Sequence, residues 1–221
     1  MANISTEDYL TAIFRNLNED GEIKPNLIAE KLQISNAAVT DMLRKLSRDG
    51  FVDYKKYKGI RLTKEGESYA KNMLRRHRIW EVFLYNKLGM SWDTIHDEAE
   101  KLEHSCSDEM INKLDEFLDF PQADPHGYPI PDKNGKIHNT NSVICISGLK
   151  KDESAKVVRV NDDVKDFLSY ITKIGIVLGK EITVKEKLEF DGSILIKIES
   201  KEINISKKVA ANIFVEKTNQ V

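Results

Sequence analysis

Residues 27–52 read LIAEKLQISNAAVTDMLRKLSRDGFV, and this stretch decides the fold of the N-terminal part of the chain. Pro25 stands near the start of a short helix, and Gln33-Ile34-Ser35 forms a polar turn after it. A second helix is expected over 36–48, ended by Gly50, with a buried face of Val39, Leu43 and Leu46. The pattern predicts a helix-turn-helix.

The flanking segments extend this motif on both sides. Residues 6–17 place apolar side chains at helical spacing, which predicts a first helix. Residues 51–63, FVDYKKYKGIRLT, read as two short strands around a basic turn. Helix, short helix, turn, helix and hairpin is the order of a winged helix-turn-helix, a DNA-binding fold, which we assign to residues 1–63.

The remainder of the chain divides into a helical part and a β part, so the predicted fold class is mainly α with small β parts. Helices are expected over 64–88, 91–105 and 107–118, which gives a helical domain over 64–131. Four of the five prolines fall in residues 121–131, PQADPHGYPIP, and residues 132–154 are predicted to be a linker. Residues 155–221 form a small β domain, with strands predicted at 156–160, 181–187, 193–198 and 213–216 and a helix at 164–174.

Composition and charge exclude several classes of protein. No stretch approaches the roughly 20 apolar residues of a membrane span, and the N-terminus has no secretory signal, so a cytoplasmic protein is expected. Cys106 and Cys145 share no CxxC spacing and are expected to be reduced thiols. Residues 1–78 hold 15 Lys and Arg against 11 Asp and Glu, whereas the rest carries a net charge of −6. A basic head on an acidic body favours nucleic acid at one end and cations at the other.

Residues 96–104, HDEAEKLEH, carry the chemistry of the helical part. On a helix, one face presents His96, Glu100, Glu103 and His104. The preceding helix offers His77 and Glu81, again four residues apart. Imidazole and carboxylate donors suit borderline or hard divalent cations, although such a face is also compatible with a solvated helix surface. The HExxH pattern of zinc peptidases and the ExxH pattern of di-iron bundles are both absent, so these residues favour holding a metal over catalysis.

The order of these motifs resembles the diphtheria toxin repressor family of iron- and manganese-dependent regulators. The resemblance rests on a winged helix-turn-helix followed by RRHRIWEVFLYNKLG, HDEAEKLEHSCSDEM and LDFPQADPHGYPIP, and covers residues 5–131. It continues more loosely into the β domain, which it implies to be SH3-like. It also implies that residues 64–131 bind metal and mediate formation of a homodimer, and that the partner is a double-stranded DNA operator. Neither a membrane nor a small organic substrate is expected as a partner.

The resemblance implies two metal sites. The family's ancillary site maps to His77, Glu81 and His96. Further candidate ligands are Asp124, Asp162, Asp163 and Asp166. The primary site maps to Asp8, Glu100, Glu103 and His104. Iron-type members carry methionine and cysteine where this chain has Asp8 and Glu100, so the ligand set resembles the manganese-type branch. Thr11 stands where two-domain manganese regulators have a second acidic residue, which favours separate sites over a tightly paired binuclear one.

The candidate DNA-contacting residues lie on the second helix of the motif and on the wing. The exposed start of the recognition helix offers Ser35, Asn36, Ala37, Thr40, Asp41 and Arg44. Asn36 and Thr40 suit base edges, and Ala37 suits a thymine methyl group. Phosphate contacts are expected from Arg44, Lys45, Arg48, Lys55, Lys56 and Lys58.

Together these features predict a metal-dependent DNA-binding repressor of metal-uptake genes, responsive to Mn²⁺, and not an enzyme. Other divalent transition metals are expected to bind in vitro. An iron(II)-responsive repressor of the same family is the alternative within the class. A metalloenzyme using the His/Glu cluster, and a winged-helix regulator of small organic ligands, are the alternatives from other classes.

Overall fold

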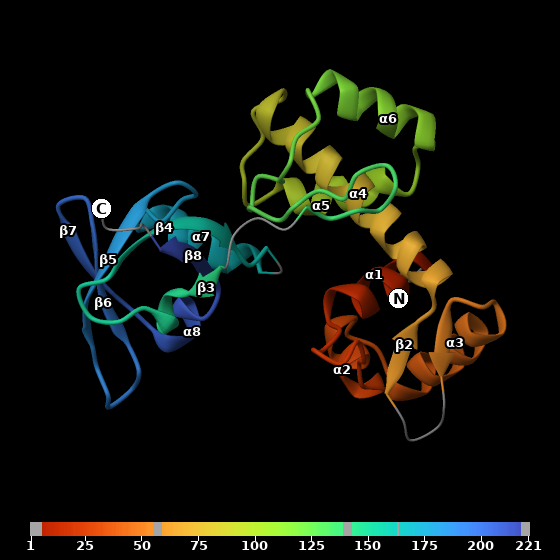
Figure 1. Ribbon diagram of the computed structural model, residues 1–221, viewed down its shortest axis with the longest axis horizontal. Helices are drawn as coiled ribbons and strands as arrows, with labels where there is room; N and C mark the ends of the chain where they lie inside the picture. The colour runs from red at the N-terminus through yellow and green to blue at the C-terminus, as the bar shows by residue number, and fades with distance from the viewer. Residues whose placement is uncertain (1–5, 55–58, 139–142, 163, 218–221) are drawn as a thin grey trace. The chain divides into compact units, whose positions relative to one another are not determined.

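The computed structural model describes residues 6–54, 59–138, 143–162 and 164–217. It divides into two compact units, which are treated separately. The first contains residues 1–76 and 131–137, and the second contains residues 77–130 and 138–221. Figure 1 traces the chain by residue number. No helix among the described residues is long and apolar enough to cross a membrane.

The first unit contains the predicted winged helix-turn-helix. Its helices are α1 (Thr6–Arg15), α2 (Pro25–Lys31) and α3 (Asn36–Arg48), and its wing strands β1 (Val52–Tyr54) and β2 (Ile60–Leu62) pair antiparallel. The apolar spacing seen in the sequence is the reason for this packing. The fully buried core side chains include Leu10, Ile13, Ile28, Val39, Leu43, Leu46 and Ile60.

Local signals set both ends of α3. The Ser35 side chain accepts a hydrogen bond from the Ala38 backbone N–H at 3.2 Å, which caps the N-terminus. At the other end Gly50 has a φ of +84°, and the Phe51 N–H reaches back to the Leu46 carbonyl at 2.9 Å. A residue with positive φ followed by this backward bond is the usual glycine stop of a helix.

The helical part is built from α4 (Lys64–Asn86), α5 (Ile95–Glu103) and α6 (Asp108–Phe117). The boundary between the two units falls inside α4. Helix α5 begins four residues later than the predicted 91–105, because Ser91 and Thr94 close a turn in front of it, with Thr94 N–H donating to Ser91 O at 2.9 Å. Ser107 caps α6 by accepting from the Met110 N–H at 3.2 Å.

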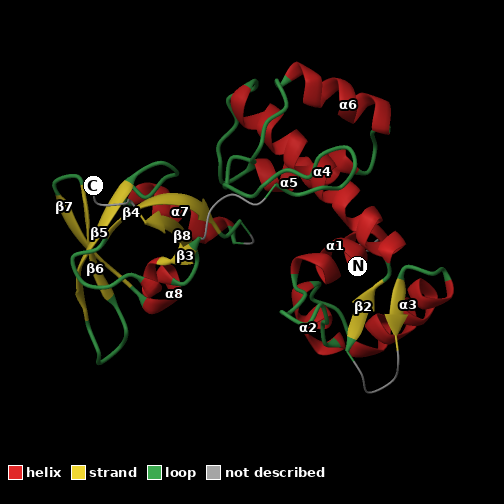
Figure 2. Cartoon of the chain, in the orientation of Figure 1, coloured by secondary structure: helices red, strands yellow, loops and turns green. Residues whose placement is uncertain are grey.

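The β part of the second unit is one antiparallel six-stranded sheet in the order β3-β8-β4-β5-β6-β7 (Figure 2). The strands are β3 (Ile144–Cys145), β4 (Ser154–Val160), β5 (Glu181–Lys187), β6 (Ile194–Ile198), β7 (Lys201–Ile205) and β8 (Ile213–Lys217). The short elements between them are η1 (Ile146–Gly148), α7 (Lys165–Lys173) and α8 (Lys207–Ala210). The predicted SH3-like β domain is confirmed, with β3, β7 and α8 as additions to the predicted elements.

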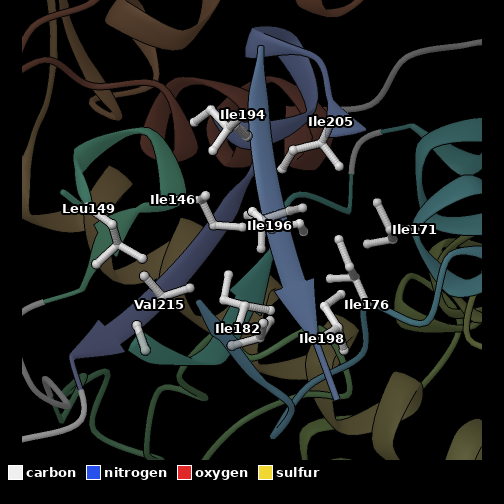
Figure 3. Packing of buried hydrophobic residues seen from close by; sticks show 14 of the residues in the cluster. Ile146, Leu149, Ile171, Ile176, Ile182, Ile194, Ile196, Ile198, Ile205 and Val215 are labelled. Atoms are coloured by element: carbon white, nitrogen blue, oxygen red, sulfur yellow. The ribbon is translucent and has the colours of Figure 1, made fainter. Parts of the chain in front are cut away.

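The core of this sheet explains why it includes residues of the predicted linker. Ile194, Ile196 and Ile198 alternate along β6 and point into a cluster with Ile146, Leu149 and Val215 (Figure 3). Ile146 and Leu149 are fully buried there, although they lie within the stretch 132–154. Their burial, and the pairing of Ile144 with Val215, hold the end of that stretch on the sheet.

Candidate metal centre

Glu81 on α4 has a fully buried side chain that faces three imidazole rings. Its Oε1 lies 3.2 Å from His77 Nε2, 3.4 Å from His96 Nδ1 and 3.6 Å from His126 Nδ1. Asp162, which follows β4, lies 3.9 Å from His96 Nδ1 through its Oδ2. We call these five residues the Glu81 cluster: His77, Glu81, His96, His126 and Asp162. All five belong to the second unit.

Helical spacing accounts for half of this arrangement. His77 and Glu81 are four residues apart on α4 and so lie on one face of that helix. His96, at the start of α5, brings its Nδ1 to 3.0 Å from His77 Nε2, with the two rings edge-to-face. This part of the cluster is the one that the sequence predicts for the ancillary site.

The other half comes from loops. Asp162 is one of the three aspartates proposed as candidate ligands from the β domain, and it is buried. His126 lies in the segment of chain that connects α6 to β3, and it was not among the predicted site residues. Its Nε2 lies 3.0 Å from the carbonyl oxygen of Trp92, so the neutral ring donates there and leaves the lone pair of Nδ1 facing Glu81. The only signal in the sequence is a histidine two residues after Asp124 in the proline-rich stretch.

The ligand atoms come together as two groups that share Glu81. One is His77, Glu81 and His96, and the other is Glu81, His126 and Asp162; within each group the candidate atoms lie within 4.8 Å of one another. Two buried polar atoms of the cluster, Glu81 Oε2 and His126 Nδ1, have no hydrogen-bond partner among the described residues, and the same holds for Asp124 Oδ2. Buried polar atoms normally have partners, so a cation is a suitable occupant. Nitrogen and carboxylate donors without sulfur suit Mn²⁺, Fe²⁺ or Zn²⁺.

The electrostatics of the cluster are strongly perturbed. Burial works to lower the pKa of His77, but the carboxylates of Glu81 and Glu103 outweigh it and raise this pKa to about 10. Burial likewise works to raise the pKa of Glu81, but the facing imidazoles, His77 first, hold it well below its usual range. Without metal, the positive charge that balances these carboxylates is the proton on His77. A divalent cation bound at the same place supplies a larger positive charge.

The predicted primary ligands lie in both units. Asp8 is half-buried on α1 of the first unit. In the second unit Glu103 is buried at the end of α5, next to the exposed His104, and Glu100 is exposed on the same helix. His77 Nδ1 lies 2.5 Å from Glu103 Oε2, and His104 Nε2 lies 3.5 Å from Glu103 Oε1. Glu103 thus joins the end of α5 to the Glu81 cluster.

The remaining acidic candidates differ from one another. Asp124 is buried, its Oδ2 lies 3.4 Å from Arg78 Nε, and burial together with Glu81 raises its pKa to about 6. Asp166 is exposed on α7. Asp163 lies outside the described residues. Cys106 accepts a hydrogen bond from Trp80 Nε1 at 3.4 Å and packs against the apolar cluster of the helical part, as expected for a packing residue.

The candidate DNA-contacting residues lie at the exposed start and side of α3. Ser35 serves as the cap, and Asn36 and Ala37 are exposed beside it. The Thr40 hydroxyl donates to the Asn36 carbonyl at 2.8 Å, and Arg44 pairs with Asp41 at 3.2 Å. The other basic candidates on this helix, Lys45 and Arg48, are exposed. The wing candidates Lys55, Lys56 and Lys58 lie outside the described residues.

Comparison with known proteins gives three matches to family models along the chain. Residues 1–60 match the N-terminal DNA-binding domain of iron-dependent repressors, and residues 63–132 match their metal-binding and dimerisation domain. Residues 144–217 match the FeoA domain. The three ranges together cover most of the sequence.

Individual relatives match over 71–97% of this chain. The diphtheria toxin repressor of Corynebacterium efficiens is 30% identical in an alignment of 226 positions, which covers 97% of this chain and 96% of that protein. The transcriptional regulator MntR of Oceanobacillus iheyensis is 28% identical over 156 residues, 71% of this chain and 99% of that protein. Among solved structures, a manganese-dependent transcriptional repressor in complex with manganese has a TM-score of 0.88 and 34% identity, covering 96% of this chain and 99% of its own.

Proposed function

Because this chain belongs to the diphtheria toxin repressor family of metal-dependent transcriptional repressors, we propose that it represses metal-uptake genes in response to Mn²⁺. The observation that carries the proposal is the buried Glu81 cluster, in which three imidazoles and two carboxylates converge. Such a set of donors is costly to bury without a cation to neutralise it. The proteins named above include a transcriptional repressor described as manganese-dependent.

The choice of Mn²⁺ over Fe²⁺ rests on ligand chemistry. None of the proposed ligands is a thiolate or thioether, and carboxylate-rich sites favour the harder ion. Asp8 and Glu100 stand where the iron-type members carry sulfur ligands. Fe²⁺ remains the second candidate, because imidazole and carboxylate also bind it. The same donors are expected to take Cd²⁺ or Zn²⁺ in vitro.

Asp8, Glu100, Glu103 and His104 are proposed to hold a second cation jointly. When bound, the metal supplies the positive charge that lets these carboxylates lie close together. Without it the three carboxylates repel one another, which favours other arrangements of the DNA-binding domain. Metal thus shifts the population towards the DNA-binding conformation.

The DNA partner is proposed to be a double-stranded operator read by α3. Asn36, Ala37 and Thr40 are proposed to contact base edges, and Lys45 and Arg48 to contact phosphates. The exposed N-terminal turn of α3 supports this assignment, because recognition helices contact bases through their first turns.

A homodimer is proposed to form through the helical domain. Three large apolar side chains at and after α6 are exposed: Met110 by 48%, Phe117 by 63% and Phe120 by 58%. Large exposed apolar groups within a dimerisation domain indicate a covered surface. A two-fold dimer places two recognition helices on half-sites about 34–36 Å apart.

A catalytic role is the competing proposal from another class. Catalytic metal sites keep an open position beside a base or nucleophile. The buried groups around Glu81 are histidines and carboxylates that already face one another, which supports a structural and sensing role. We infer that the chain is not an enzyme and acts in the cytoplasm, where its operator lies.

DNA duplexes that bind the Mn²⁺-loaded protein are first selected from a random library. The test then titrates the protein anaerobically with MnCl₂ or FeCl₂ and measures its binding to these duplexes. Mn²⁺ is expected to raise DNA affinity by about 5–150-fold, the usual range of allosteric coupling. Glu81→Gln and Asp8→Ala are expected to lose this response, whereas Glu116→Gln, an exposed carboxylate on α6, retains it. Metal-independent DNA binding by the wild type would favour a regulator of small organic ligands. A stronger response to Fe²⁺ than to Mn²⁺ would favour the iron-responsive alternative.

A further inference from the structure

The chain passes between the two compact units three times. It first crosses inside α4, between residues 76 and 77, then leaves the second unit after Ile130 and returns to it at His138. The segment between these last two points, residues 131–137, belongs to the first unit, which also contains the winged helix-turn-helix. We call this segment the strap; its sequence is PDKNGKI.

The strap begins shortly after His126, one of the proposed metal ligands. Pro129 and Pro131 stand on either side of Ile130. Each proline ring fixes its own φ and restricts the residue before it to extended backbone. Ile130 is buried in the apolar cluster of the helical part, and the Pro129 carbonyl accepts a hydrogen bond from Arg78 Nη1 at 2.5 Å. The backbone that leads from His126 to the strap is therefore short and stiff.

Residues 132–136 of the strap close a turn whose shape is set by Asp132. The Gly135 N–H donates to the Asp132 carbonyl at 2.9 Å, and the Asp132 N–H donates to the Lys136 carbonyl at 2.9 Å. Asp132 Oδ1 accepts from the N–H groups of Asn134 at 2.8 Å and Lys136 at 2.9 Å. Gly135 has a φ of +75°, which glycine adopts readily. Aspartate at the first position and glycine at the fourth favour such a turn, so its shape is encoded locally.

The turn packs on Lys71 of α4. A Cβ atom at Gly135 would lie 3.6 Å from Lys71 Cδ and 3.8 Å from Lys71 Cβ, so the glycine lies along the aliphatic part of that side chain. The Lys71 ammonium group lies 5.8 Å from the centre of the Phe14 ring of α1 and 2.6 Å from Glu67 Oε1. Lys71 thus contacts both the strap and α1, and all of these residues belong to the first unit.

His126 is the proposed ligand whose position depends most on a loop. His77 and Glu81 lie on the regular helix α4, whereas His126 belongs to no named helix or strand. Loops are commonly less stable locally than helices, so metal binding has more to change at His126 than on α4. The strap continues this loop along the chain, and its contact with Lys71 leads to α1, the helix that carries Asp8.

We propose that the strap is a second mechanical connection, in addition to α4, through which metal binding at the Glu81 cluster acts on the DNA-binding domain. This inference rests on the proposed function, in which the cluster holds the cation and the cation raises DNA affinity. Coupling between two sites is a free energy separate from the affinity of either site. Loosening the strap therefore leaves the metal ligands in place and reduces the effect of the metal on DNA binding.

The experiment measures the coupling ratio of the full-length protein, which is its affinity for the selected DNA duplexes with saturating MnCl₂ divided by its affinity without metal. Asp132→Ala removes the acceptor of two backbone N–H groups, and Lys71→Ala removes the side chain that packs on Gly135. Each is expected to lower the coupling ratio about fivefold or more, up to complete loss of the response. Metal-free DNA affinity is expected to change by less than about twofold, as for most surface substitutions.

Three control variants separate the strap from a general loss of stability. Asp132→Asn keeps the Oδ1 acceptor and Lys71→Met keeps an unbranched aliphatic side chain, so both are expected to retain the wild-type ratio within about twofold. Asp191→Ala changes a matched turn of the β domain, in which the carboxylate accepts from the Ser193 N–H at 2.9 Å, and is also expected to retain the ratio. Thermal unfolding of every variant is measured alongside.

The outcomes distinguish this inference from the proposed function. The inference requires each alanine variant to have a lower coupling ratio than its conservative partner, and equal ratios within either pair would overturn it. An equally large loss in Asp191→Ala would also overturn it. If Asp132→Ala does not fold, the two Lys71 variants decide the question. A wild-type protein whose DNA affinity does not respond to Mn²⁺ would contradict the proposed function itself, and the inference with it.

Discussion

Metal binding at the Glu81 cluster is predicted to release the proton of His77, and this makes the affinity strongly pH-dependent. The pKa of His77 in the metal-free protein is about 10, because Glu81 and Glu103 outweigh the effect of burial. A cation requires the lone pair of Nε2, so the proton must leave. At pH 7, three units below that pKa, deprotonation costs about 4 kcal/mol, or about a thousandfold in affinity.

The sign follows from the direction of the shift. A pH between 6.5 and 8.5 lies below the pKa of His77, so each unit by which the pH rises reduces the loss of Mn²⁺ affinity caused by deprotonation tenfold. Mn²⁺ affinity is expected to increase about a hundredfold over this range from His77 alone. His126, whose pKa is also raised because Glu81 outweighs burial, adds to the dependence.

The assay is competition with a fluorescent chelator under anaerobic conditions, plotted as log Kd against pH. Replacing His77 by glutamine is expected to reduce the slope by about one, since one proton fewer is displaced. His138→Gln, which changes an exposed histidine of the same unit, is the matched control and is expected to keep the wild-type slope. Equal slopes for the wild type and His77→Gln would refute the reasoning.

Three further substitutions test separate parts of the molecule. Ser35→Ala removes the cap of α3 and is expected to cost about 1 kcal/mol, measured by urea unfolding, with weaker DNA binding; unchanged stability would contradict the role of the cap. Phe117→Glu places a charge on the exposed apolar surface of α6 and is expected to shift the dimer towards monomer in sedimentation, whereas an unchanged mass would mean that the dimer uses another surface. Gly127→Ala is expected to destabilise the second unit and weaken Mn²⁺ binding, because the added Cβ would collide with the Val158 carbonyl oxygen. The control is Gly175→Ala, at a glycine with a similar φ of +86° but open space around it, which should leave Mn²⁺ affinity unchanged.

The winged helix-turn-helix was predictable because its signals are local. The cap at Ser35, the glycine stop at Gly50 and the spacing of Val39 and Leu43 all lie within one or two turns of the structure that they specify. The strands β5 and β6 were predictable for the same reason, since buried residues alternate along them. Strand β7 was missed because only two apolar residues, Ile203 and Ile205, alternate along it, after two charged residues. Strand β3 has two residues, and only its pairing with β8 defines it.

The candidate metal site also has a part that could be predicted from the sequence and a part that could not. His77 and Glu81 are a helical pair, and His96 opens the adjacent helix, so spacing was enough to single them out. His126 belongs to no helix or strand, and its place beside Glu81 depends on a turn closed by Asp124 and on contacts with β4. Single-sequence patterns carry no information about such long-range contacts. The choice of Asp162 among three aspartates required the same information, because only its burial beside His96 distinguishes it.

His77 gives a physical reason why the two proposed metal sites are not independent. Its Nε2 faces Glu81 in one site, while its Nδ1 lies 2.5 Å from Glu103, a proposed ligand of the other. An imidazole that binds a cation through Nε2 keeps its proton on Nδ1, and therefore donates a hydrogen bond to Glu103. That bond holds the Glu103 side chain in one orientation. Loading of the Glu81 cluster is thus predicted to orient Glu103, which is a ligand in the proposed second site.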